Sequence, residues 1–189
     1  HYGYDANGNV RSITPPERPA HALAYTPVDL VSSYTAPDVG AESDEARYIY
    51  NADRQITRIE RPDDKIVRFD YDAAGRLAML TLPGGPISYT YDAKTGQVAR
   101  IIRSDGSTLA YTYDGSLLKS QRWSGAIMGT VGYSYDKDLR LASITVNGSD
   151  PIAYRYDKDG LVTQAGALVI GRDLQNGSVV STTLGSNLS

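Results

Sequence analysis

Residues 67–91 read VRFDYDAAGRLAMLTLPGGPISYTY, which is one unit of a repeat followed by the start of the next. The first five residues alternate apolar with charged side chains, as in a β-strand with one covered face. The sequence DAAG then offers an aspartate that can cap local amides and a glycine that can adopt positive φ. Residues 76–82 form a return strand, and Pro-Gly-Gly-Pro ends it. A turn this short joins only antiparallel strands, so the stretch predicts a β-hairpin.

The motif Tyr-x-Tyr-Asp that closes the first strand recurs along the chain. The complete copies are Tyr2-Gly3-Tyr4-Asp5, Tyr89-Thr90-Tyr91-Asp92, Tyr111-Thr112-Tyr113-Asp114, Tyr133-Ser134-Tyr135-Asp136 and Tyr154-Arg155-Tyr156-Asp157. The variants are Tyr48-Ile49-Tyr50-Asn51 and Phe69-Asp70-Tyr71-Asp72. From Tyr50 onward the second tyrosines are 20 to 22 residues apart. A fixed period of this length indicates a repeat architecture in which each unit packs against its neighbours.

The composition is that of a soluble protein with an unusual excess of tyrosine. The 189 residues are 41% hydrophobic and 22% charged, and they include fifteen tyrosines, one phenylalanine and one tryptophan. The net charge of −3 argues against a nucleic-acid partner. The absence of cysteine excludes disulfides, a thiolate nucleophile and zinc–thiolate sites. No apolar run is long enough to predict a membrane span.

The predicted fold class is all-β: antiparallel hairpins of about 20–22 residues that form a curved, spiralling sheet. The return strands carry apolar residues three apart, such as Leu77 and Leu80, or Ile56 and Ile59. In a regular strand such residues face opposite sides. We therefore predict a β-bulge after the first turn, which brings both residues onto one face.

A single repeat-built sheet over residues 1–189 is the predicted domain organisation. Residues 13–47 are interpreted as a degenerate unit with a proline-rich segment and an acidic loop at Asp38–Asp44; an interdomain linker is the competing interpretation. Residues 48–165 hold the regular repeats, and residues 166–189 a degenerate end. Both termini look like cut points within a longer polypeptide.

The Tyr-x-Tyr-Asp series, the Gly75-Arg76-Leu77 turn and the Pro-Asp-Gly-like second turns together resemble the YD repeats of the Rhs family. The segment His21-Ala22-Leu23-Ala24-Tyr25-Thr26-Pro27 resembles a variant unit of bacterial Rhs proteins. This resemblance implies a hairpin ribbon wound into a hollow shell, which encloses a C-terminal toxin in bacterial Rhs proteins and toxin-complex C subunits. In teneurins a related shell serves adhesion. The autoproteolytic Asp-Pro-x-Gly-Leu-type segment of the bacterial shells is missing here, since Asp150-Pro151 continues as Ile152-Ala153.

The resemblance implies a non-enzymatic shell segment whose partners are the rest of the parent shell and an enclosed C-terminal effector. The parent protein would be secreted or displayed at the cell surface by a bacterial secretion system. The alternative is a teneurin-like adhesion or carbohydrate-binding module. Unpaired strand edges also predict edge-to-edge self-association of the isolated chain.

We identify no catalytic, cofactor-binding or metal-binding residue in the sequence. The repeated Tyr-Asp pairs are interpreted as packing and turn residues, because a catalytic constellation is rarely repeated at even spacing. The same structural role is assigned to Gly75. The loops after Asp5 and Asp157 lack the ligand pattern of calcium sites. Trp123 departs from the repeat; it either packs on a neighbouring strand or marks a partner surface.

Overall fold

The computed structural model describes residues 1–37 and 44–185, and these form strands and turns without helices. The chain divides into two compact units, His1–Tyr89 and Thr90–Ser189. Most of the predicted acidic loop at Asp38–Asp44 lies outside the described residues. No helix that could cross a membrane occurs in the described part of the chain.

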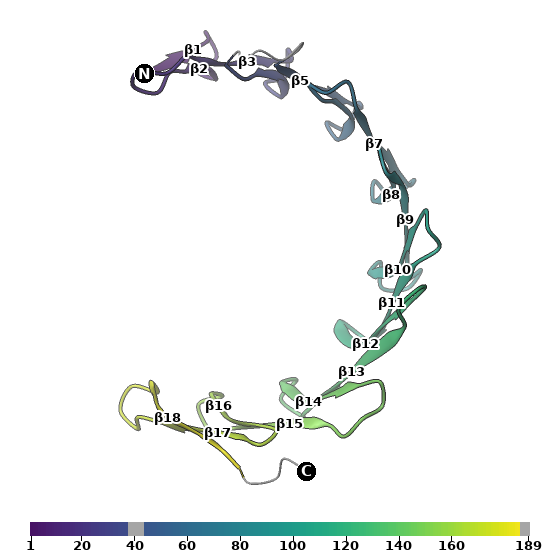
Figure 1. Cartoon of the computed structure of the whole chain (residues 1–189), viewed down its shortest axis with the longest axis vertical. Coiled ribbons are helices and arrows are strands. Elements are labelled where there is room, and N and C mark those ends of the chain that lie inside the picture. The colour runs from purple at the N-terminus through teal and green to yellow at the C-terminus, as the bar shows by residue number, and fades with distance from the viewer. Residues whose placement is uncertain (38–43, 186–189) are drawn as a thin grey trace. The chain divides into compact units, whose positions relative to one another are not determined.

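The first unit is a succession of hairpins in chain order (Figure 1). Its strands are β1 (Tyr2–Tyr4), β2 (Val10–Ile13), β3 (His21–Tyr25), β4 (Val31–Thr35), β5 (Glu45–Tyr50), β6 (Ile56–Glu60), β7 (Ile66–Tyr71), β8 (Leu77–Leu82) and β9 (Gly85–Tyr91), the last of which crosses the boundary between the units. From β1 to β8, each strand pairs antiparallel with the strand that follows it.

The second unit continues the same pattern. Its strands are β10 (Val98–Arg103), β11 (Thr108–Asp114), β12 (Leu117–Ser124), β13 (Gly129–Tyr135), β14 (Leu141–Val146), β15 (Ile152–Tyr156), β16 (Val162–Ala165), β17 (Leu168–Arg172) and β18 (Val179–Leu184). From β10 to β17, each strand pairs antiparallel with the strand that follows it. The predicted all-β class, built from antiparallel hairpins, is therefore confirmed.

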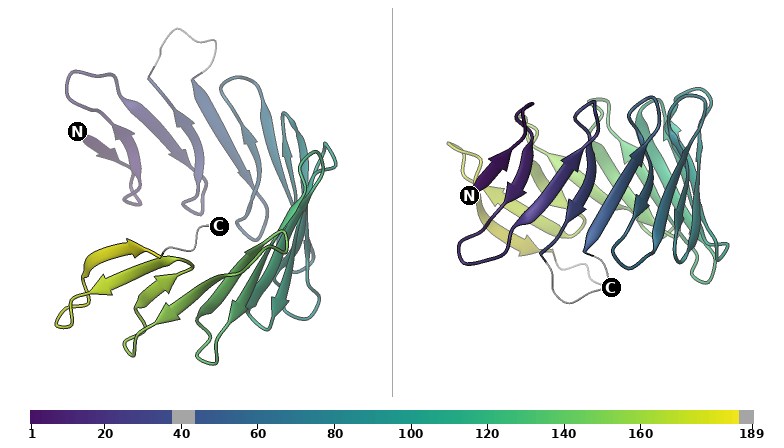
Figure 2. Two further views of the ribbon diagram at one scale, coloured as in Figure 1. Left: turned by 60° about the horizontal axis from the view of Figure 1, so that its bottom comes forward. Right: turned by 90° about the horizontal axis from the view of Figure 1, so that it is seen from above.

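The turns of each unit alternate between two opposite rims of the sheet (Figure 2). The turns that follow the second tyrosine of each hairpin form one rim, which we call the first-turn rim. The turns that connect one hairpin to the next form the opposite rim, which we call the second-turn rim. Among the described residues none is completely buried, so neither unit encloses a conventional hydrophobic core. The single sheet layer is held by contacts within each hairpin and between neighbouring hairpins.

The predicted bulge is present in the return strand of each hairpin for which the register is described. Tyr71 lies opposite Leu77, but the preceding residue Asp70 lies opposite Met79, so Ala78 is the extra residue. Phe69 lies opposite Leu80. Because Phe69 and Tyr71 are two apart and share a face, both leucines lie on that face with them. The bulge thus explains the three-residue apolar spacing.

Among residues 1–37 and 44–185, six non-glycine residues adopt positive φ, and Leu139 is the one whose side chain suits that conformation least. Its φ is 61°, at the position that Gly75 occupies in its own turn with a φ of 75°. The leucine side chain is 67% exposed, so packing offsets little of this strain. In the left-handed region a Cβ atom lies too close to the following carbonyl oxygen.

We expect Leu139→Gly to raise the free energy of unfolding by about 1 kcal/mol, since it removes left-handed strain that exceeds the entropic disadvantage of glycine. Urea denaturation followed by circular dichroism measures this change. Lys137→Gly in the same turn is the control, because Lys137 does not have positive φ. Equal effects of the two substitutions would contradict the strain argument.

Candidate functional site

The joint between consecutive hairpins is the feature that the repeat motif builds. Between β6 and β7 the paired residues are Arg58 with Arg68, Ile59 with Val67, and Glu60 with Ile66. Strand β6 starts two residues before Arg58, so its first residues have no ladder partner on β7. Neighbouring hairpins are thus paired toward the second-turn rim and separate toward the first-turn rim.

A tyrosine hydroxyl closes this separation. The Tyr71 hydroxyl donates a hydrogen bond of 2.8 Å to the carbonyl oxygen of Ile56. Ile56 is the residue that lies opposite Tyr50, the second tyrosine of the preceding hairpin. We call this bond the tyrosine latch. It gives a donor to the carbonyl of a residue that has no ladder partner on β7, and an unpaired backbone acceptor away from water is costly.

The tyrosine latch recurs in both units with nearly constant length. The other bonds run from Tyr25 to Val10 (2.9 Å), Tyr50 to Val31 (2.7 Å), Tyr113 to Val98 (2.8 Å), Tyr135 to Leu118 (2.9 Å) and Tyr156 to Leu141 (2.8 Å). Burial raises the pKa of the Tyr50 and Tyr113 hydroxyls, and nearby tyrosines add to this rise. These hydroxyls therefore stay protonated as donors. The first tyrosine of a motif instead lies opposite an apolar residue in several hairpins, as Tyr48 lies opposite Ile59, whereas Tyr111 lies opposite Gln121.

Two latch residues fall outside the tyrosine series recognised in the sequence. Tyr25 belongs to the variant segment at residues 21–27, and its hydroxyl bonds the Val10 carbonyl. At the end of the second unit, Arg172 takes the place of tyrosine, and its Nε atom donates to the Val162 carbonyl at 2.9 Å. Its terminal nitrogen donates to the Gly177 carbonyl at 2.9 Å. Both residues could be located in the sequence by their position, because each directly precedes a residue that starts a turn: Thr26 follows Tyr25, and Asp173 follows Arg172.

The aspartate that follows the second tyrosine holds the first turn closed. Asp72 Oδ1 accepts hydrogen bonds from the amides of Ala74 and Arg76, both at 2.9 Å. The Arg76 side chain donates from Nε to Asp72 Oδ2 at 2.8 Å. Equivalent bonds to turn amides are made by Asp5, Thr26, Asn51, Asp92, Asp136, Asp157 and Asp173.

Asp114 is the exception among the motif aspartates. Strand β11 continues through Asp114, which lies opposite Leu117 across a two-residue turn. Gly115 supplies positive φ there, at 58°. The short turn has no loop amides that could donate hydrogen bonds to the carboxylate. This aspartate therefore does not cap the turn.

The turn bonds shift the pKa of the carboxylates. The Arg76 side chain, followed by its amide, holds the pKa of Asp72 below the ordinary value of 3.8. The amide of Arg140 does the same for Asp136, and the amide of Thr95 for Asp92. Hydrogen bonds to the ionised carboxylate favour the charged form.

These lowered values predict acid sensitivity. A carboxylate whose pKa is lower in the folded state stabilises the fold above its unfolded value, 3.8, and this contribution disappears as the pH falls through the folded-state pKa. We expect the thermal unfolding midpoint to be nearly constant from neutral pH down to the unfolded-state pKa of 3.8. Below that pH the midpoint should fall. Differential scanning calorimetry between neutral and acidic pH measures it. The double variant Asp72→Asn/Asp136→Asn should flatten the acid limb, and an unchanged limb would contradict the assignment.

Side chains at the start of the return strands connect neighbouring turns along the first-turn rim. Gln55 donates to the Gly75 carbonyl of the next turn at 2.7 Å. The Arg140 guanidinium lies 4.7 Å from the ring centre of Tyr156, the latch tyrosine of the next hairpin. Such cation–π contact adds to the latch. The first turns that contain Gln55 and Arg140 therefore support the next hairpin as well as their own.

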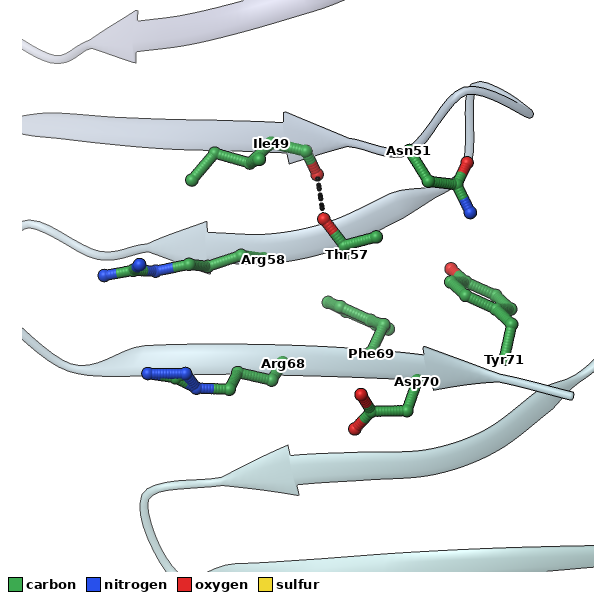
Figure 3. A pocket seen from close by; sticks show the side chains of 8 residues that line it. All are labelled: Ile49, Asn51, Thr57, Arg58, Arg68, Phe69, Asp70 and Tyr71. Atoms are coloured by element: carbon green, nitrogen blue, oxygen red, sulfur yellow. Dashed lines mark hydrogen bonds between the residues drawn. The ribbon is translucent and has the colours of Figure 1, made fainter.

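The separation between β6 and β7 leaves a hollow of about 440 Å³, shown in Figure 3. It is lined by Ile49, Asn51, Thr57, Arg58, Arg68, Phe69, Asp70 and Tyr71. Arg58 is paired with Glu60 at 2.7 Å, and the Thr57 hydroxyl donates to the Ile49 carbonyl at 3.2 Å. The Tyr71 hydroxyl is engaged in its latch. Three polar groups of this hollow, on Thr57, Arg58 and Tyr71, are thus engaged within the sheet.

The remaining sequence candidates occupy structural positions. His21 Nδ1 and the Tyr34 hydroxyl are 2.7 Å apart, and the two rings stack. In the described residues no three His, Asp or Glu side chains come together as a possible metal site. Latch hydroxyls are bonded to backbone carbonyls, which argues against Tyr-Asp pairs as sugar-binding groups.

This arrangement defines a hairpin-repeat structural protein in which tyrosines join successive units. The chain matches the family model described as teneurin YD-shell over residues 1–187. It therefore belongs to the teneurin YD-shell family. A comparison with curated protein sequences finds no match.

Solved toxin-complex structures share the fold. A chain of the Photorhabdus luminescens Tc holotoxin pore with a TccC3 variant superposes with a TM-score of 0.66 at 17% identity, over 97% of this chain and 12% of that one. A chain of the TcdB2–TccC3 crystal structure gives 0.60 at 17% identity, over 84% of this chain and 11% of that one. This chain thus spans about an eighth or less of the length of those chains.

Proposed function

We propose that this chain is a non-catalytic wall segment of a YD-repeat shell that encloses a C-terminal effector of its parent protein. The tyrosine latch carries the proposal. It recurs between hairpins in both units and joins neighbouring hairpins through the repeated tyrosines. The hydroxyl groups of these tyrosines therefore serve to hold the sheet together. Membership of the YD-shell family supports the same role.

The proposed partners are the remaining hairpins of the parent shell and the enclosed effector. The fold shared with TccC3-containing toxin complexes supports this proposal. We further propose that the parent protein is secreted or surface-displayed through a bacterial secretion system. In this role the sheet separates the effector from solvent until delivery, and no cofactor is needed.

Limited proteolysis of the parent protein from its natural source tests the proposal. Peptide mapping by mass spectrometry first establishes which segment follows the repeats. We expect that segment to resist protease in the native protein and to be cleaved once the shell is denatured. Equal cleavage rates in the native and denatured protein would overturn enclosure.

Self-association of the isolated 189-residue chain is a second consequence of the sheet. Strand β18 pairs with β17 among the described strands, and all six of its residues are exposed. It contains no charge or proline, two of the features that normally protect an edge, and its bulge residue, Val180, is the one feature of that kind that it has. We expect an apparent mass that rises with concentration in light scattering.

Val180→Lys provides the matched test of this edge. Val180 is 64% exposed in β18, and a lysine there should reduce association because edge charges oppose strand pairing. Val28→Lys is the control, because Val28 is also exposed, at 49%, but lies in the β3–β4 turn. A strict monomer at all concentrations would contradict the expectation.

A further inference from the structure

An apolar groove of about 390 Å³ lies toward the second-turn rim of the second unit. Its floor is one cross-strand row: Ile101 lies opposite Leu109, and Leu109 lies opposite Trp123. Ala126 and Ile127, from the connection between β12 and β13, form a wall. Ile127 is 77% exposed, so this wall has no covering side chain among the described residues.

Trp123 has a defined position in this floor. It lies opposite Gly129, and a Cβ atom at Gly129 would collide with the indole ring. The indole therefore lies against the bare backbone of β13, where another residue would displace it. Trp123 is the single tryptophan of the chain, so its fluorescence reports directly on the groove.

A cation lines the same groove. Arg103 follows Ile101 by two residues on β10 and shares its face. No carboxylate among the described residues forms an ion pair with Arg103. Asp105, in the adjacent turn, is bonded instead to the amide and hydroxyl of Ser107, at 2.8 and 2.5 Å. The Arg103 charge acts on Asp105 at longer range, but no described carboxylate contacts it directly. The groove thus combines an apolar floor with a guanidinium whose hydrogen-bond donors are not held by an ion pair.

We propose that this groove binds a polypeptide segment in which a branched apolar side chain stands beside a free carboxylate. The apolar side chain would lie on the floor of Leu109 and Trp123, and the carboxylate would accept hydrogen bonds from the Arg103 guanidinium. Guanidinium groups bind carboxylates in a bidentate fork, which fixes orientation. The volume lies in the range of sites that hold small ligand groups. This recognition is independent of the proposed shell function.

The test is a titration of the complete chain with N-acetyl-leucine, followed by Trp123 fluorescence. We expect saturable binding at millimolar concentrations. N-acetyl-leucine amide, which lacks the charge, should bind roughly tenfold more weakly, as should N-acetyl-leucine to the Arg103→Gln variant. Ile127→Ser should also weaken binding, and this exposed position leaves the fold intact.

Arg100→Gln is the matched control, because Arg100 is on the same strand but lies opposite Ala110 on the other face. It should bind N-acetyl-leucine as the unaltered chain does. An absence of any fluorescence response, or equal losses in Arg100→Gln and Arg103→Gln, would overturn the proposal. Octanoate binding more tightly than N-acetyl-leucine would assign the groove to acyl chains and overturn the polypeptide assignment.

Discussion

Tyr71→Ala is expected to lower the free energy of unfolding by about 2 kcal/mol. The substitution removes a half-buried ring from between two hairpins and leaves the Ile56 carbonyl without its donor. Ring burial and the lost hydrogen bond each contribute about 1 kcal/mol in a position of this exposure. Urea denaturation monitored by circular dichroism measures the loss.

Tyr71→Phe separates the hydroxyl from the ring. It keeps the packing and removes only the latch bond, so we expect a loss of about 1 kcal/mol. Tyr4→Phe is the control, since Tyr4 is 61% exposed and lies on β1, which has no preceding hairpin among the described residues. If Tyr71→Phe were as harmless as Tyr4→Phe, the latch would contribute nothing to stability.

Gly129→Ala is expected to lower the free energy of unfolding by about 2 kcal/mol, because the added methyl group occupies the position of the Trp123 ring. The indole must rotate away from β13 toward solvent. Its fluorescence emission should therefore shift to longer wavelength in the folded state. Both quantities come from a single denaturation experiment, because the chain has one tryptophan.

Gly84→Ala is the control for this substitution. Gly84 has no heavy atom within 4 Å of an added Cβ and does not have positive φ. We expect a change within about 0.5 kcal/mol, as for other surface substitutions. If Gly129→Ala left both stability and the emission wavelength unaltered, the close packing of Trp123 on Gly129 would be wrong.

The bulge is a structural feature that could be predicted from local sequence alone. A glycine at positive φ after a capping aspartate predicts both the turn and the extra residue, and the three-residue apolar spacing requires that residue. These signals lie within one hairpin, where turn geometry sets the register. The structure accordingly shows the predicted displacement at Ala78.

The latch could not be predicted from the motif in the same way. The sequence identified Tyr71 as a repeated packing residue, but its bond partner Ile56 belongs to the preceding hairpin, fifteen residues earlier. Arg172 was missed because it shares no side-chain type with tyrosine, although it also donates to a backbone carbonyl. Asp114 matches the motif and yet caps no turn, because a shorter loop removes the amides.

The sequence by itself determined the strand-forming alternation, the turn positions and the repeat period, because these depend on side-chain pattern and turn chemistry within some twenty residues. Only the tertiary structure decided which backbone carbonyl each second tyrosine bonds, and where Trp123 rests. Both depend on where ladder pairing between hairpins stops and on how closely the backbone of a neighbouring strand approaches. The end of the ladder pairing and the approach of the neighbouring strand depend on residues of different hairpins. A sequence pattern within one hairpin does not connect these residues.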